Sequence, residues 1–350
     1  MLNQFVETYE MLERLCRLDG PSGFERSVTT EAKQLLEPLM DEVWTDRLGN
    51  VVGVRRCGKP GARKLLLDAH LDEIGLVVTG IQDGFLRFGT IGGVDPRMLP
   101  DRELTILTDP PMLGVVACLP PHVLSAEDRE KAPPVQDFYV NTGLSQEEAE
   151  RRIPIGTPMV FRGSFFRLGK NQVCGKALDD RSCFTALLRA AQMLQGKELN
   201  VDLCLMGSVQ EEVGCAGAAT GTQALAPNCC VAVDVTHGRT PDSPKDQAYA
   251  LGGGPAVAIG PNMTRWMSSR LLELAEKEGI PVQREVIGGH SGTNAWVMQT
   301  RNEGVATAVV SLPLKYMHTP VEVLDLDDLE NTAKLLASFV EHFDEERDGQ

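Results

Sequence analysis

The chain has 350 residues, a formal net charge of -15 at pH 7 and 42% hydrophobic residues. Its length predicts one large domain plus a smaller one, and its strong negative charge argues against nucleic acid and anionic membranes as partners. The nine cysteines are an odd number without a CxxC pair, which fits neither a disulfide framework nor a zinc finger. We therefore expect buried free thiols and a reducing cytoplasm.

The first segment predicts an amphipathic helix and not a signal peptide. In MLNQFVETYEMLERLCRL, residues such as Phe5, Leu12 and Leu15 recur at near-helical spacing, and no basic region precedes a continuous apolar one. No run approaches the roughly 20 apolar residues that are needed to span a bilayer. These features predict a cytoplasmic protein.

The predicted elements change near residue 74 from helices and buried strands to a series of short strands separated by turns. A turn cluster at 19–23 precedes a helix expected over 27–39, and strands are expected at 51–55 and 64–69. Short strands separated by Gly, Pro and Asp turns then follow, in the order IGLVVTG, FLRFGT, ELTILTD, LGVVACL and PMVFRGS. Their spacing predicts a small β-barrel or sandwich, with a proline-rich loop at 119–137 and one short helix at 145–152.

Strands and helices alternate from about residue 173 to the end. Helices are expected at 180–194, 267–278 and 327–343, and the strands carry VDLCLMGSVQ, NCCVAVDVT, AVAIG and VATAVVSLPL. This alternation predicts an α/β fold with a mixed, largely parallel sheet sandwiched by helices. We expect residues 1–70 and 169–350 to form this domain, interrupted by an inserted β-barrel domain at 71–168.

Acidic and imidazole side chains stand at the ends of several apolar strands. They are His70 with Asp72 just after it, the pair Glu211 and Glu212, Asp234, and His318. Ligands of open α/β sheets bind beyond the carboxyl ends of the strands, so four strands present metal-type side chains where a site is expected. Asp179 and Asp180 add carboxylates at the start of an expected helix.

Each of these residues also has a purely structural interpretation. An Asp at a helix start commonly acts as an N-cap, a single His after a strand can be structural, and adjacent glutamates can form a solvated turn. Asp234 fits such an interpretation least, because a carboxylate inside CVAVDVT is costly to bury without a partner. Their shared position at strand ends favours a functional site.

The mixture of side chains suits a site for two divalent cations. Such a site needs a bridging carboxylate with further His and carboxylate ligands, and zinc, cobalt or manganese accept these donors. Without a cysteine in the set, a structural zinc site is disfavoured. One carboxylate of the pair Glu211–Glu212 can bind metal while the other acts as a general base, and Asp72 can orient His70.

The same segments resemble the M42 family of metallo-aminopeptidases. They are AHLDEIG (69–75), KALDDR (176–181), QEEVGCAGA (210–218), AVDVT (232–236), GGGP (252–255), SGTNAW (291–296) and YMHTPVEV (316–323), in the family order. The resemblance implies removal of N-terminal residues from short peptides, two divalent metal ions per subunit, and a small inserted β-barrel. It also implies dimers that build a tetrahedral dodecamer.

The resemblance also implies a role for each site residue. The implied metal ligands are His70, Asp179, Glu212, Asp234 and His318, with Asp179 bridging the two ions. Glu211 would be the general base and Asp72 would orient His70. The peptide bond after Asp179 is expected to be cis.

Three positions depart from the family pattern or have no assigned role. Asn294 in SGTNAW and Asn141 in YVNTG stand where many relatives have Asp. Neither belongs to the ligand set, so they could alter capping, assembly or substrate preference while metal binding survives. His290 could line the pocket or lie in a loop without a role.

Three other functions compete with the aminopeptidase. A two-metal deacylase or deacetylase would use the same site on N-acylated substrates, but the order of the motifs and the position of the insertion count against it. A non-catalytic protein would lack a ligand or the base, and none is missing. An endoglucanase is disfavoured because glycosidases use two metal-free carboxylates that flank the sugar.

Overall fold

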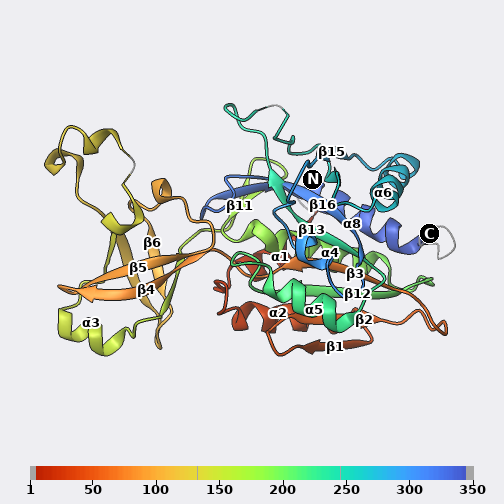
Figure 1. Ribbon diagram of the computed structural model, residues 1–350, viewed down its shortest axis with the longest axis horizontal. Helices are drawn as coiled ribbons and strands as arrows, with labels where there is room; N and C mark the ends of the chain where they lie inside the picture. The colour runs from red at the N-terminus through yellow and green to blue at the C-terminus, as the bar shows by residue number, and fades with distance from the viewer. Residues whose placement is uncertain (1–4, 132, 245, 344–350) are drawn as a thin grey trace.

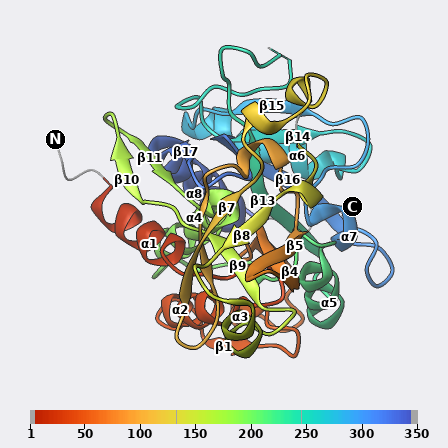
Figure 2. The same cartoon turned by 90° about the vertical axis from the view of Figure 1, so that its left-hand side faces the viewer.

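The computed structural model describes residues 5–131, 133–244 and 246–343. An α/β body lies beside a smaller β-barrel, which stands at the left of Figure 1 and faces the viewer in Figure 2. The expected fold, a sheet sandwiched by helices with an inserted small barrel, is confirmed. None of the helices in the described ranges has the length and apolarity that crossing a bilayer requires.

The α/β body is built on one eleven-stranded mixed sheet. Its main path, in spatial order, is β1 (Glu42–Thr45), β2 (Val51–Arg55), β12 (Asp202–Ser208), β3 (Lys64–His70), β13 (Cys229–His237), β16 (Ala306–Lys315), β17 (Glu322–Asp325), β11 (Gln172–Gly175) and β10 (Phe166–Leu168). Beside this path, β14 (Ala256–Ile259) pairs with β16, and β15 (Gln283–Val286) pairs with β14. The four central strands β12, β3, β13 and β16 are mutually parallel, so their carboxyl ends meet at one edge.

Helices cover both faces of this sheet. They are α1 (Val6–Cys16), α2 (Arg26–Leu36), α4 (Leu178–Met193), α5 (Ala216–Leu225), α6 (Arg265–Glu278), α7 (Ala295–Met298) and α8 (Leu326–Glu341). Along β3, Leu65 and Leu67 join the core that contains α1, α4 and α8, whereas Leu66 joins the core that contains α5 and α7. Burial on both faces explains why the central strands are continuous apolar runs and do not alternate with polar residues.

The barrel is closed by six antiparallel strands. In spatial order they are β4 (Gly75–Gln82), β5 (Phe85–Ile91), β8 (Tyr139–Asn141), β7 (Met112–Ala117), β6 (Glu103–Ile106) and β9 (Pro158–Phe161). Helix α3 (Gln146–Arg152) begins with a capping box in which the Ser145 hydroxyl accepts from the Glu148 N–H. The barrel has its own apolar core and begins five residues after the end of β3, close to the metal-type ligands.

The structure refines several element boundaries. The N-terminal helix begins at Val6, and residues 1–4 of the expected helix lie outside the described part. Five strands that the sequence analysis did not place (β1, β10, β11, β15 and β17) extend the sheet on both sides of its parallel centre. None of the nine cysteines forms a disulfide, and seven of them are buried, as expected.

Candidate metal centre

The carboxyl ends of the central strands bring the expected site residues together. His70 is the last residue of β3 and lies in register with Ser208 at the end of β12, three residues before Glu211. Asp234 lies in β13, and His318 follows β16 after a short turn. The parallel register therefore places all four segments at one edge, as the sequence predicted.

The first group of possible metal ligands comprises His70, Asp179 and Asp234. All three are buried, and their ligand atoms lie within 4.8 Å of one another. Nε2 of His70 lies 3.1 Å from Oδ1 of Asp179. Nδ1 of the same ring lies 3.1 Å from the carbonyl oxygen of Asp72 and 3.5 Å from Oδ1 of its carboxylate, so the closer contact of the ring is with the backbone of residue 72.

The second group comprises Asp179, Glu212 and His318, again with ligand atoms within 4.8 Å of one another. Nε2 of His318 lies 3.4 Å from Oδ2 of Asp179 and 3.2 Å from Oε1 of Glu212. Asp179 belongs to both groups and offers one oxygen to each, which is the geometry of a carboxylate shared between two cations.

Asp179 does not act as a helix cap. The residue before the first turn of α4 is Ala177, and both Asp179 and Asp180 have non-helical dihedral angles. The peptide bond between them is cis, as expected. The capping interpretation of this pair is therefore wrong: the chain kinks here and the Asp179 carboxylate points at the two histidines.

A buried ionic cluster anchors the chain on both sides of this kink. Nζ of Lys176 lies 2.7 Å and 2.8 Å from the two carboxylate oxygens of Glu73, and Arg181 donates to the same carboxylate at 3.0 Å. Arg181 also donates to the carbonyl oxygen of Leu71. The start of α4 is thereby tied to the segment that follows His70.

Asp72 holds the turn that carries the two glutamates. Its carboxylate accepts from the backbone N–H groups of Glu211 at 3.1 Å and Glu212 at 3.2 Å, and from the Ser22 hydroxyl at 2.6 Å. Two hydrogen bonds from consecutive amides fix the turn after β12 relative to β3. The side chain of Glu212 is thereby directed to His318, and that of Glu211 lies next to Cys215, whose Sγ is 3.5 Å from Oε1.

The electrostatics of the centre are dominated by buried carboxyl groups. Burial raises the pKa of Asp234 well above its usual range. Burial, together with the negative charges of Glu212 and Asp179, raises the pKa of Glu211 to about 7, against the opposing effect of His70. Burial acts to lower the pKa of His318, but its hydrogen bonds with Asp179 and Glu212 outweigh this and raise it to about 11. Crowded, buried carboxyl groups thus favour the uptake of positive charge in the centre, whether as protons or as bound cations.

Two residues that the sequence analysis did not single out complete the centre. Glu322, the first residue of β17, accepts hydrogen bonds from the backbone of both α4 and the His318 turn. Gly93 of the barrel side accepts from Nδ1 of His318 through its carbonyl oxygen at 2.9 Å, and a Cβ atom there would lie 2.8 Å from that nitrogen. Glu322 stands in the motif YMHTPVEV, but no sequence pattern pointed to Gly93.

The remaining residues of interest lie outside the two groups. Asn294 is buried and donates to Asp68 and Ser208 below the sheet edge, whereas Asn141 accepts from the Gly143 N–H in a barrel turn. His290 is exposed and packs on Trp296, with ring centroids 4.1 Å apart.

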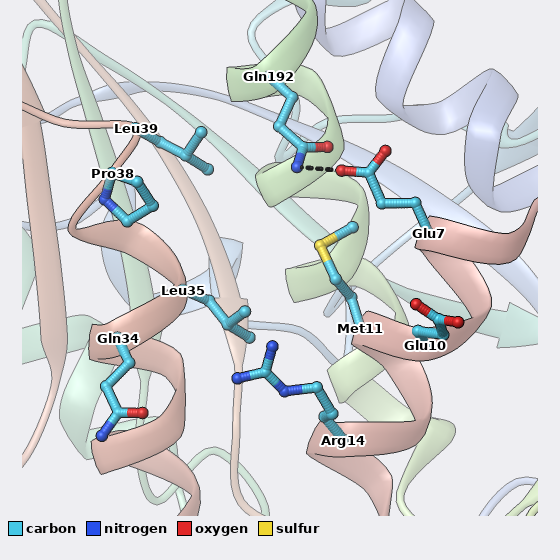
Figure 3. Close-up of a pocket in the computed structure, with 9 residues that line it drawn as sticks. All are labelled: Glu7, Glu10, Met11, Arg14, Gln34, Leu35, Pro38, Leu39 and Gln192. Atoms are coloured by element: carbon cyan, nitrogen blue, oxygen red, sulfur yellow. Dashed lines mark hydrogen bonds between the residues drawn. The ribbon is translucent and has the colours of Figure 1, made fainter.

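Two hollows in the surface differ in their relation to the centre. One of about 540 Å³ opens beside His318, and its lining includes Gly93, Asp95 and Tyr316. The other, of about 380 Å³, lies between α1, α2 and α4, where Gln192 donates to Glu7 at 2.7 Å (Figure 3). None of the possible metal ligands lines this second hollow, whereas His318 lines the first, and a smaller pocket is lined by Asp179, Glu212 and His318.

The donor set fits divalent cations. Oxygen and imidazole donors converge from separate strands, and Asp179 offers an oxygen to each group. Carboxylates buried at this density are costly without positive charge beside them. Zinc, cobalt and manganese all accept such ligands.

Comparison with known proteins identifies the family. The model of the M42 glutamyl aminopeptidase family matches residues 49–335. This chain belongs to the M42 family. As an M42 peptidase it is an aminopeptidase, a hydrolase of peptide bonds that depends on divalent metal ions.

Individual relatives of this M42 peptidase match over nearly their whole length. The lysyl aminopeptidase of Pyrococcus furiosus is 37% identical over 339 residues, covering 95% of this chain and 96% of that protein. The solved structure of an aminopeptidase from Desulfurococcus kamchatkensis has a TM-score of 0.89 at 36% identity and covers 96% of this chain and 95% of the other. The TET1 peptidase of Pyrococcus horikoshii, described as able to assemble into a tetrahedron or a large octahedral shell, has a TM-score of 0.84 at 31% identity, with 96% and 100% covered.

Proposed function

We propose that this M42 peptidase removes N-terminal residues from short peptides at a centre that holds two divalent metal ions. The proposal depends on the position of the Asp179 carboxylate: one of its oxygens faces His70 and the other faces His318. In the proposed assignment His70 and Asp234 complete one metal site, and Glu212 and His318 complete the other.

Different residues of the centre have different roles in the proposed reaction. Two cations bound there would polarise the scissile carbonyl group and make a water molecule easier to deprotonate. Glu211 is not needed as a ligand in either group and serves as the general base: its carboxylate takes a proton from the attacking water and passes it to the leaving amine. Burial raises the pKa of Glu211, which makes this carboxylate a better proton acceptor, and bound cations would oppose that rise. Asp72 positions the base through the amides of the turn.

The hollow beside His318 is placed to receive the N-terminal side chain of the substrate. Its lining comes from both parts of the molecule, with Gly93 and Asp95 from the barrel side and His237 and Gln247 from the α/β body. Its volume of about 540 Å³ is large enough for an amino-acid side chain. We infer that short peptides in the cytoplasm are the substrates, with zinc, cobalt or manganese as the metal.

We propose further that the inserted barrel, expected at 71–168, serves assembly, and that the chain forms dimers that build a tetrahedral dodecamer. The barrel strands run from Gly75 to Phe161, and β10 at 166–168 belongs to the α/β sheet. The outer face of β7 supports a role in assembly, since Leu113 is 61% exposed and Val115 is 46% exposed on neighbouring outward positions. Apolar patches of this kind mark interaction surfaces. Light scattering with size-exclusion chromatography tests the assembly, and a monomeric wild-type protein would contradict it.

The deciding experiment compares aminoacyl-anilides with their N-acetylated counterparts. The enzyme is stripped with a chelator, reloaded with zinc, cobalt or manganese, and assayed beside Glu211→Gln. We expect cleavage of free-amine substrates only, restored by metal, with kcat in Glu211→Gln lower by about 10²- to 10⁴-fold, the range of general-base catalysis. Cleavage of the acetylated series would favour the deacylase, and absence of cleavage by metal-loaded wild type would contradict both functions.

A further inference from the structure

The carboxylate of Glu322 connects the two chain segments that carry Asp179 and His318. Its Oε2 accepts from the backbone N–H groups of Leu178 at 2.8 Å and Asp179 at 3.2 Å. Its Oε1 accepts from the backbone N–H of His318 at 2.9 Å. The Glu322 side chain therefore holds the backbone of Asp179, which belongs to both metal groups, and the backbone of His318, which belongs to only one.

Both connected segments contain backbone conformations that need an external restraint. Ala177, two residues before Asp179, has φ of 53°, and His318 itself has φ of 60°. The left-handed conformation is unfavourable for a residue with a Cβ atom, so neither segment would keep this shape by local preference. The carboxyl group of Glu322 accepts hydrogen bonds from three backbone N–H groups, and these bonds restrain both segments.

The location of Glu322 is set by the sheet and not by the centre itself. Glu322 is the first residue of β17 and pairs with Gly175 at the end of β11, which leads directly into the kink before α4. The side chain is 2% exposed, so water does not compete for its oxygens. The contact between β17 and β11 therefore places a rigid acceptor between the two ligand segments.

We propose that Glu322 is a positioning residue that sets the affinity of the cation held by Asp179, Glu212 and His318. The proposal rests on the two-metal function proposed above. Glu322 would bind no cation: it orients the Asp179 and His318 side chains through their backbone. Residues that orient metal ligands from outside typically change metal affinity by about 10- to 100-fold when they are replaced.

Two substitutions separate position from charge. Glu322→Gln keeps the length of the side chain but replaces one acceptor oxygen by an NH₂ group, which cannot accept from the amide that it faces. Glu322→Asp keeps the charge but is one methylene shorter, so it cannot span both segments. The matched control is Glu330→Gln in α8, because Glu330 is also a buried carboxylate but its partners, Thr8 and Arg189, lie outside the centre.

The test titrates metal-free wild type and variants with Co²⁺, using calorimetry for the two dissociation constants and visible absorption for the coordination of each ion. Circular dichroism verifies that each variant is folded. In both Glu322 variants we expect one dissociation constant to rise by about 10- to 100-fold. The other should rise less, because Glu322 also holds His318, which belongs to only one group. Glu330→Gln should leave both constants close to those of wild type even if it lowers the melting temperature.

Different failures point to different proposals. Wild type that binds two ions, with both constants unchanged in folded Glu322→Gln and Glu322→Asp, would overturn the inference and leave the proposed function standing. Equal weakening of both ions in Glu322→Gln with no change in Glu322→Asp would show that the position of the carboxyl group does not matter, which also overturns the inference. Wild type that binds fewer than two ions would overturn the two-metal function, and this inference with it.

Discussion

Nε2 of His70 lies 3.1 Å from Oδ1 of Asp179, although 109 residues separate them along the chain. The contact joins the end of β3 to the kinked start of α4 across the inserted barrel. Because the second oxygen of Asp179 faces His318, this one carboxylate connects all the ligand-bearing segments. The first prediction below follows from this position of the Asp179 carboxylate between the two histidines.

Replacing Asp179 by Asn should abolish two-metal binding. The amide loses the charge and replaces one of the two acceptor oxygens by a donor, so it cannot be shared between cations. We expect metal content below that of wild type and activity lower by at least about 100-fold, more than is typical for residues that only orient ligands. Elemental analysis and anilide hydrolysis measure both. The control is Asp202→Asn at the opposite end of β12, which should leave the metal content unchanged. An unchanged metal content in Asp179→Asn would rule out a carboxylate shared between two cations.

Removal of metal should lower the stability of the folded protein. Without cations, the carboxylates of Asp179, Glu212 and Asp234 are buried side by side. A ligand that binds only the folded state at 100 times its dissociation constant stabilises by about 2.7 kcal/mol. Calorimetric scans should therefore show a lower melting temperature after chelation, reversed by added metal. An equal melting temperature with and without metal would mean that the cluster binds no cation. In Asp179→Asn, the difference in melting temperature between the metal-loaded and metal-free protein should be much smaller than in wild type.

Gly217→Ala should destabilise the protein and disturb the glutamate turn. A Cβ atom at Gly217 in α5 would lie 2.3 Å from Oδ1 of Asn50 and 2.3 Å from the carbonyl oxygen of Val209, just before that turn. Overpacking of this kind costs about 1–3 kcal/mol, which urea unfolding can measure. Gly288→Ala is the control, because its Cβ would meet no atom within 4 Å. A Gly217→Ala variant as stable as the control would show that α5 can move away from Asn50.

Asp328 should contribute a pH-dependent part of the stability. Its two oxygens accept from the N–H groups of Gly252 and Gly254, each at 2.7 Å, and burial raises its pKa to about 7. An unfolded Asp titrates near pH 4, so the folded state holds an extra proton between about pH 4 and pH 7. The contribution is full below this window and is lost as the pH rises through it.

The test measures urea unfolding of wild type and Asp328→Asn across this window. Between about pH 4 and pH 7 the free energy of unfolding should fall more steeply with pH in wild type, because the variant has no proton to lose at residue 328. Titration of the metal centre cancels in the difference between the two proteins. Parallel pH profiles would show that Asp328 is ionised throughout.

Much of the fold could be predicted because many of its strands and helices have a recognisable pattern of apolar and turn residues. The apolar run LLLDAH shows a strand buried on both faces, and the short strands after residue 74 show the barrel, since each pattern follows from the burial of a few neighbouring side chains. The strands that carry weak signals were missed. For example, β11 and β17 are four residues long and are held in the sheet by pairing with each other, with β10 and with β16.

The sequence by itself predicted which possible ligands converge, because His70, Asp234 and the glutamate pair lie in or just after apolar strands expected to be parallel, whose carboxyl ends share an edge. Only the tertiary structure decided how they meet. The kink that turns Asp179 away from capping α4, the Gly93 carbonyl against His318 and the Glu322 carboxylate between two segments all depend on contacts between residues far apart in the chain. Spacing along the chain records burial and local conformation, but the packing of sheet, helix and barrel sets the distances between such residues.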